Sequence, residues 1–281
     1  MWWMVAKEAL ANWSSHKDAR QGAALAYYSV FSIGPIILIA IAVAGLFFGR
    51  EAVTGQVMST LQGMLGESGA KAIEGMLAGA NRPAAGLLAT VFGIVALLFA
   101  AIGVVVQLKD ALNVVWEVKE PKEGGLWPFA RNYVLSFAAV LALGFLLLVS
   151  LLVTAGLAAA GKFVAPYLPE GILHIVSMLV SFAVVTVLFA MMFKWLPDVS
   201  VSWSDVWLGA LLTALFFELG KAAIGLYIGK QGLESTYGAA ASIVVVLIWV
   251  YYTSQIILMG AEITHAYSKR HEAAAQRGRR G

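Results

Sequence analysis

The stretch WLGALLTALFFELGKAAIGLYI, residues 207–228, is long and apolar enough to cross a bilayer, yet Glu218 and Lys221 stand near its middle. A charged side chain at the bilayer centre costs at least about 2.5–3.5 kcal/mol, so such residues usually contact a partner or a water-filled cavity. Because Glu218 and Lys221 are three residues apart, they share a helix face and can pair. The stretch predicts a membrane-spanning helix with a polar site halfway across; the alternative is an ion pair that only fixes helix packing.

The rest of the chain is similarly apolar. Of its 281 residues 60% are hydrophobic and 12% charged, and the mean hydropathy is +0.83, whereas a soluble domain carries about 25% charge. Apolar runs of about 20 residues predict membrane helices. These runs cover residues 27–48, 84–106, 133–160, 172–195, 206–228 and 239–264. We therefore predict an all-α polytopic membrane protein with six transmembrane helices and no soluble domain.

The distribution of lysine and arginine predicts the orientation. With six spans and both termini inside, thirteen of these residues fall in inner segments and five in outer ones. This bias favours cytoplasmic termini. The predicted organisation is an amphipathic cytoplasmic segment over residues 1–20, a membrane domain over residues 21–265 and a basic cytoplasmic tail over residues 266–281.

Two segments outside the spans have helical periodicity. Trp2, Val5 and Ala9 recur on one side of the first segment, which predicts an amphipathic helix lying in the cytoplasmic interface or, equally, packed on the inner end of the bundle. Residues 51–82 contain two apolar helical patterns separated by Gly66 and Gly69. We predict an outer helical hairpin there, as a lid or a simple connector.

Further candidate site residues lie in the first span. Pro35 cannot donate a hydrogen bond to the Phe31 carbonyl, so a kink or break is expected. Tyr28, Ser32 and Pro35 share a face, and a freed carbonyl beside hydroxyl groups is tolerated in a membrane where it is buried in protein or faces a cavity. The alternative is a kink that serves only packing.

The last span carries a second polar stripe. Tyr251, Gln255 and Glu262 are separated by four and seven residues, so they follow one side of a helix. We expect this stripe to face the interior of the bundle. The alternative is that Glu262 extends to the inner membrane surface.

The sequence lacks the common catalytic and metal-binding motifs. There is no cysteine, and His16, His174, His265 and His271 are scattered without HxH or HExxH spacing. Walker, GxSxG and dinucleotide-binding patterns are also missing. We therefore predict no enzyme activity, no metal, no cofactor and no nucleic-acid partner, and nuclease activity in particular is rejected.

Several motifs together resemble one family. They are ALAYYSVFSIGP at residues 24–35, LKDALNVVWEV at 108–118, WLPDVSVSWSDVWLGA at 195–210, FFELGKAAIGLYI at 216–228 and YGAAASIVVVLIWVYYTSQIILMGAE at 237–262. Over roughly residues 15–265 the chain is similar to the YihY/BrkB family of bacterial inner-membrane proteins, once labelled ribonuclease BN-like. The resemblance implies a six-helix inner-membrane protein with both termini cytoplasmic, and it implies little about activity.

The leading functional hypothesis is a transport-type protein. A cavity lined by the first, fifth and sixth spans would accommodate or move a lipid or another amphipathic envelope molecule, with Glu218 and Lys221 meeting a zwitterionic headgroup. Membrane lipids are then the expected partners. One alternative is ion- or proton-coupled transport in which Glu218 or Glu262 titrates. Another is a non-catalytic scaffold that binds envelope proteins through the outer hairpin and the basic tail.

Overall fold

A computed structural model of the chain describes residues 2–80, 87–118, 170–230 and 241–278, and the regular secondary structure of these residues is entirely α-helical. The predicted all-α class is confirmed for this part of the chain. The helices are α1 (Trp2–Ser15), α2 (Asp18–Phe48), α3 (Arg50–Ala80), α4 (Leu87–Val115), α6 (Glu170–Trp195), α7 (Trp203–Lys230) and α9 (Ala241–Gly278).

Three segments within these helices are long and apolar enough to cross a membrane: Asp18–Leu46, Met178–Trp195 and Ile243–His271. They coincide with the first, fourth and sixth predicted spans. Helices α4 and α7 occupy the second and fifth. The third predicted span, residues 133–160, lies outside the described residues, so the count of six remains a prediction.

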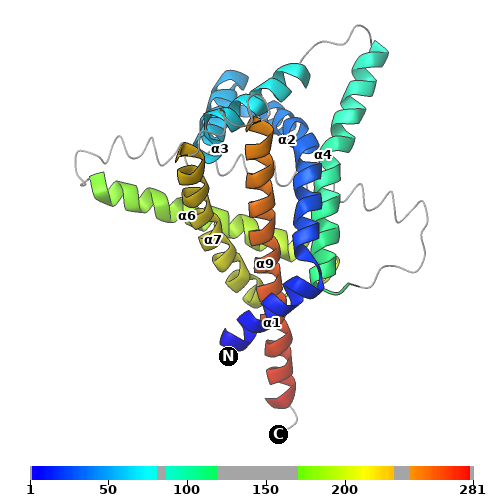
Figure 1. Ribbon diagram of the computed structural model, residues 1–281, viewed down its shortest axis with the longest axis vertical. Helices are drawn as coiled ribbons and strands as arrows, with labels where there is room; N and C mark the ends of the chain where they lie inside the picture. Colours follow the sequence, from blue (N-terminus) through cyan, green and yellow to red (C-terminus); the bar gives the residue numbers. More distant parts are fainter. Residues whose placement is uncertain (1, 81–86, 119–169, 231–240, 279–281) are drawn as a thin grey trace.

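Helix α9 is the centre of the molecule. It runs along the long axis in Figure 1 and contacts α1, α2, α3, α4 and α7. Helix α1 and the C-terminal end of α9 lie together at one end, which we call the inner end, and α3 lies at the opposite end. Helix α1 and the C-terminal end of α9 thus lie at the same end of the molecule, and the cytoplasmic orientation of this end stays a prediction.

Helix α1 packs on the bundle. Val5 and Ala9 are buried, the ring of Trp2 stacks on Tyr267 of α9 with centroids 5.8 Å apart, and Arg270 donates to Glu8 at 2.6 Å. The structure therefore agrees with the second of the two interpretations of residues 1–20. The neighbouring Trp3, Met4 and Leu10 remain exposed, which leaves α1 an apolar surface at the inner end.

The structure bears on two local predictions. Helix α2 continues through Pro35 to Phe48, so the first span is not broken; a single missing hydrogen bond is tolerated when neighbouring helices and polar side chains satisfy the freed group. The alternative of a kink at Pro35 stays a prediction. Helix α3 is hydrogen-bonded as one helix from Arg50 to Ala80, but Glu51 near its start lines the same cavity as Glu74 near its end, so the predicted outer hairpin stays a prediction.

The core is divided between the two ends of the bundle. At the inner end, Leu112 of α4, Phe193 of α6 and Leu258 of α9 are fully buried in one cluster. Towards the opposite end, Ile73 of α3 packs with Val246 of α9 in a second cluster. The inner cluster also includes Leu25 of α2 and Val206 of α7, so it joins five helices.

Helices α7 and α9 approach closely through small residues. A Cβ added to Gly209 would lie 2.8 Å from the carbonyl oxygen of Gly260 and would also collide with the Thr264 side chain. Thr213 and Thr264 bond back to the carbonyls of Gly209 and Gly260. Small residues that let two backbones approach are typical of helix contacts in membranes.

We therefore expect Gly209→Ala to lower the free energy of unfolding by about 1–3 kcal/mol, because the α9 backbone must move to admit the methyl group. Gly63→Ala is the matched control. Gly63 lies inside α3 with no atom near the added methyl group, so that variant should be neutral or stabilising by up to about 1 kcal/mol. Unfolding in detergent measures both, and equal stabilities of the two variants would contradict the close contact.

Candidate functional site

Glu218 and Lys221 form an ion pair on α7. Glu218 Oε2 lies 2.5 Å from Lys221 Nζ, so the predicted pairing is confirmed. The side chains keep 28% and 38% of their surface exposed. The neighbouring Phe217 packs inward on Trp249 of α9. Within the described part of the chain, the ion pair thus lies at the margin of the bundle and not in its core.

The pair is far from the inner end of α7. Asp205 lies in the first turn of α7, and its Oδ1 is 3.1 Å from Nδ1 of His271 on α9. Thirteen residues separate Asp205 from Glu218, which corresponds to about 20 Å along the helix axis. The hydrocarbon core of a bilayer is about 30 Å thick. If Asp205 marks the membrane boundary, this distance corresponds to the predicted position of the pair well inside the membrane.

The predicted site residues of α2 do not form one polar surface. Ser32 is buried, Pro35 is half-buried and Tyr28 is exposed. A cavity of about 470 Å³ lies between α2 and α3 instead, at the end opposite α1, with apolar walls and the polar side chains of Arg50, Glu51 and Glu74. Neither Glu218 nor Lys221 lines this cavity.

The predicted stripe on α9 is divided. Tyr251 is 39% exposed, whereas Glu262 is fully buried. The alternative in which Glu262 extends to the membrane surface is therefore wrong. Gln255 accepts a hydrogen bond from the Trp13 indole at 3.1 Å and donates to the Asp18 backbone carbonyl at 3.3 Å. Gln255 and Glu262 thus face α1 and the start of α2.

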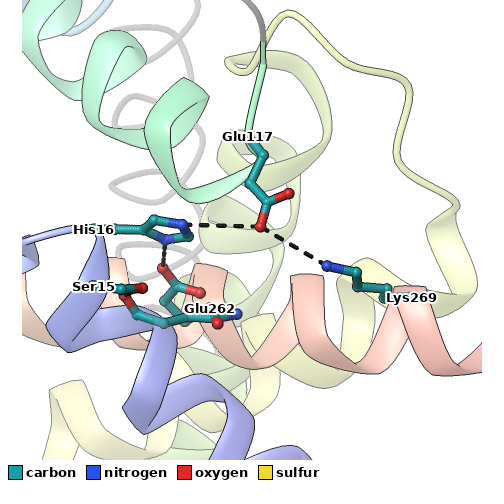
Figure 2. A network of polar contacts seen from close by, with 6 residues as sticks. Ser15, His16, Glu117, Glu262 and Lys269 are labelled. Carbon is teal, nitrogen blue, oxygen red and sulfur yellow. Dashed lines mark hydrogen bonds and ion pairs between the residues drawn. The ribbon is translucent and has the colours of Figure 1, made fainter.

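Glu262 is bonded to a histidine from the other end of the sequence. Its Oε1 lies 2.6 Å from His16 Nδ1, and the Asn12 side chain is a near neighbour of the carboxylate. Figure 2 shows His16 between Glu262 and Glu117, whose carboxylate lies 4.0 Å from the other ring nitrogen and 3.8 Å from Lys269. The first helices, the end of α4 and α9 therefore meet in one polar network.

Asp18 completes a cluster with His16 and Glu262. One potential ligand atom from each of the three residues lies within 4.8 Å of the others. Asp18 is fully buried, and neither of its carboxylate oxygens has a hydrogen-bond partner; Oε2 of Glu262 also lacks one. An unpartnered buried acceptor normally costs about 1–3 kcal/mol, and more if charged. Such groups need a specific reason to persist.

The backbone between α1 and α2 presents His16 and Asp18 together. Lys17 has φ 59° and ψ 41°, a left-handed conformation that ends α1 and starts α2. Residues other than glycine rarely adopt it. Glu117 also has a positive φ, 51°, just after α4. Lys17 and Glu117, which both have this positive φ, thus lie next to His16 of the cluster.

The structure corrects the prediction that the histidines are scattered. His16 bonds Glu262, His271 bonds Asp205, and the ring of His265 is buried 5.0 Å from that of Trp116. All three lie at the inner end. Asp18 and Glu262 are fully buried at this end.

Sequence reasoning found Glu262 and Gln255 but missed His16 and Asp18 as their partners. The local signal is the tripeptide His16-Lys17-Asp18, which places two ligand-type side chains at the start of α2. Periodicity did not single it out, because the tripeptide lies in a turn between two helices.

The family comparison agrees with a membrane protein. The sequence model of the virulence factor BrkB family matches residues 9–280. The chain belongs to the BrkB family. This BrkB-family chain is 29% identical over 260 residues to a UPF0761 membrane protein of Verminephrobacter eiseniae, covering 90% of the chain and 60% of that relative.

Two other relatives have the same description. A UPF0761 membrane protein of Albidiferax ferrireducens is 33% identical over 66% of the chain and 44% of its own length. One of Ralstonia nicotianae is 29% identical over 85% of the chain and 53% of its own length. The BrkB-family chain thus spans about half the length of these curated relatives. No solved structure matches it.

Proposed function

We propose that this BrkB-family protein is a transport-type membrane protein that moves or accommodates a lipid or another amphipathic molecule at the Glu218–Lys221 pair. The observation that carries this proposal is the position of the pair. The two opposite charges lie about the middle of an apolar helix and remain partly exposed. Charges inside a membrane usually mark a substrate or ion pathway.

The chemistry of a zwitterionic lipid headgroup fits both charges. Its phosphate would pair with the Lys221 ammonium and its amine with the Glu218 carboxylate, in place of the direct contact between the two side chains. The acyl chains would remain against apolar side chains such as Leu215 and Leu219 of α7, which are exposed beside the pair. This arrangement separates the polar and apolar parts of the substrate without an aqueous pore.

A phospholipid-translocation assay tests the proposal. The full-length protein is reconstituted in liposomes that contain a fluorescent phospholipid, and a membrane-impermeant quencher reports how fast inner-leaflet lipid becomes accessible. The wild-type protein should make quenching faster than it is in protein-free liposomes. In Glu218→Ala/Lys221→Ala the protein-dependent part of the quenching rate should fall at least about tenfold, because each lost charge contact is worth about 1.4 kcal/mol or more.

The matched control removes an ion pair of the same type elsewhere. Glu67 and Lys71 of α3 lie 2.7 Å apart and are more than half exposed, and Glu67→Ala/Lys71→Ala should leave the rate unchanged. Equal rates for the two double variants, or a wild-type rate equal to that of protein-free liposomes, would contradict the proposal. The same liposomes under an imposed pH gradient separate proton-coupled movement from uncoupled movement.

A further inference from the structure

The cluster of His16, Asp18 and Glu262 has the composition of a metal site. It offers one imidazole nitrogen and two carboxylate oxygens within 4.8 Å of one another. Imidazole suits zinc and other first-row transition metals, and carboxylates are ligands for zinc and manganese. The chain has no cysteine, so nitrogen and oxygen donors are the ligands that this protein can provide here.

The decisive observation is the unpartnered state of Asp18. Its side chain is fully buried in the cluster, and both oxygens lack a hydrogen-bond donor. Glu262 contributes a third oxygen of the same kind. Burial disfavours the charged form of a carboxylate, and a buried carboxylate is stable as an anion where it pairs or coordinates a cation. A divalent ion would supply both the compensating charge and the missing partner for these oxygens.

The geometry needs only small adjustments. Ligands bonded at about 2.0–2.1 Å in a tetrahedral arrangement lie about 3.3 Å apart. His16 Nδ1 and Glu262 Oε1, now 2.6 Å apart, would separate by less than about 1 Å, and the most distant pair would approach by about 1–2 Å. Three protein ligands leave a fourth position for water or for the nearby Asn12.

We infer that His16, Asp18 and Glu262 bind one divalent transition-metal ion of the zinc type, which joins the turn between α1 and α2 to α9. Glu117 lies beside His16 and would orient its other ring nitrogen, as outer partners of metal-bound histidines commonly do. Gly220 of α7 approaches Tyr252 of α9, and the ten residues from Tyr252 to Glu262 correspond to about 15 Å along the helix axis. The inferred metal site is therefore separate from the Glu218–Lys221 pair, and its chemistry does not depend on the proposed transport function.

Metal binding by the full-length protein tests this inference. Protein purified in detergent is stripped with a chelator and titrated with Zn²⁺ in competition with a fluorescent zinc indicator. The wild-type protein should bind one Zn²⁺ per chain, and Mg²⁺ should bind far more weakly because imidazole is a ligand for softer ions. Asp18→Asn should weaken Zn²⁺ binding at least about tenfold, since even loss of an outer partner commonly has that effect.

Asp205→Asn is the matched control. Asp205 is also a buried aspartate beside a histidine at the inner end, and its Oδ1 already lies 3.1 Å from His271. That variant should retain wild-type affinity. If Asp18→Asn does not elute as folded protein, His16→Gln takes its place. X-ray absorption of the zinc-loaded protein should show nitrogen and oxygen ligands with a single imidazole.

Failure to bind Zn²⁺, wild-type affinity in the cluster variants, or equal weakening by Asp205→Asn would overturn the inference. More than one imidazole at the zinc, or Mg²⁺ binding as tight as Zn²⁺ binding, would also overturn it. None of these results concerns lipid movement, so failure of the metal site and failure of the proposed function are distinguishable.

Discussion

Replacing His16 with alanine is expected to lower the free energy of unfolding by about 3–5 kcal/mol, measured in metal-free detergent solution. His16 supplies the 2.6 Å contact to the buried Oε1 of Glu262, and removing one partner of a buried pair leaves the other without compensation. Few single substitutions have so large an effect. The same change frees the turn that connects α1 to α2.

A second substitution distinguishes loss of the His16–Glu262 contact from loss of side-chain packing. Glu262→Met removes the acid and keeps a side chain of similar length, so His16→Ala/Glu262→Met should recover most of the lost stability. Glu117→Ala is the control on the other side of the His16 ring. Its carboxylate is 54% exposed at 4.0 Å, so its loss should cost less than about 1 kcal/mol. An effect of His16→Ala as small as that of Glu117→Ala would show that the buried contact does not stabilise the fold.

The second large effect is expected at Lys221. Lys221→Ala leaves Glu218 without its partner inside the membrane, which should lower stability by about 2.5–3.5 kcal/mol if the carboxylate stays charged there. Glu218→Ala/Lys221→Ala removes both charges and should restore most of that stability. Unfolding in lipid nanodiscs, where a bilayer surrounds α7, is the appropriate measurement.

The comparison of these two variants separates structure from function. If the pair serves only packing, the double variant should recover both stability and lipid movement. If the pair contacts substrate, stability returns but movement does not. A Lys221→Ala variant as stable as the wild type would show that Glu218 is hydrated or close to headgroups, and the membrane-embedded charge pair would then be wrong.

Much of the architecture was accessible from local sequence. Apolar length predicted the helices because a membrane span must satisfy its own backbone hydrogen bonds. Spacing predicted the Glu218–Lys221 ion pair and the inward position of Glu262, since neighbours at three or four residues share a helix face. These are short-range properties, and the structure agrees with them at each of these residues.

The failures have a common physical cause. His16 and Glu262 are 246 residues apart, and helical periodicity contains no information on which faces of two distant helices meet. The break expected at Pro35 was overestimated for a related reason. A local cost of about 3 kcal/mol for proline is outweighed when the rest of a long helix is favourable.

The central claim is that a polar group of a lipid reaches Glu218 and Lys221 inside the membrane. An experimental density map of the full-length protein in lipid nanodiscs tests it most directly. Our account predicts headgroup density within hydrogen-bond distance of both side chains, with the 2.5 Å contact between them widened to admit it. A pair enclosed by protein side chains on every side, with no lipid beside α7 at this level, would contradict the account.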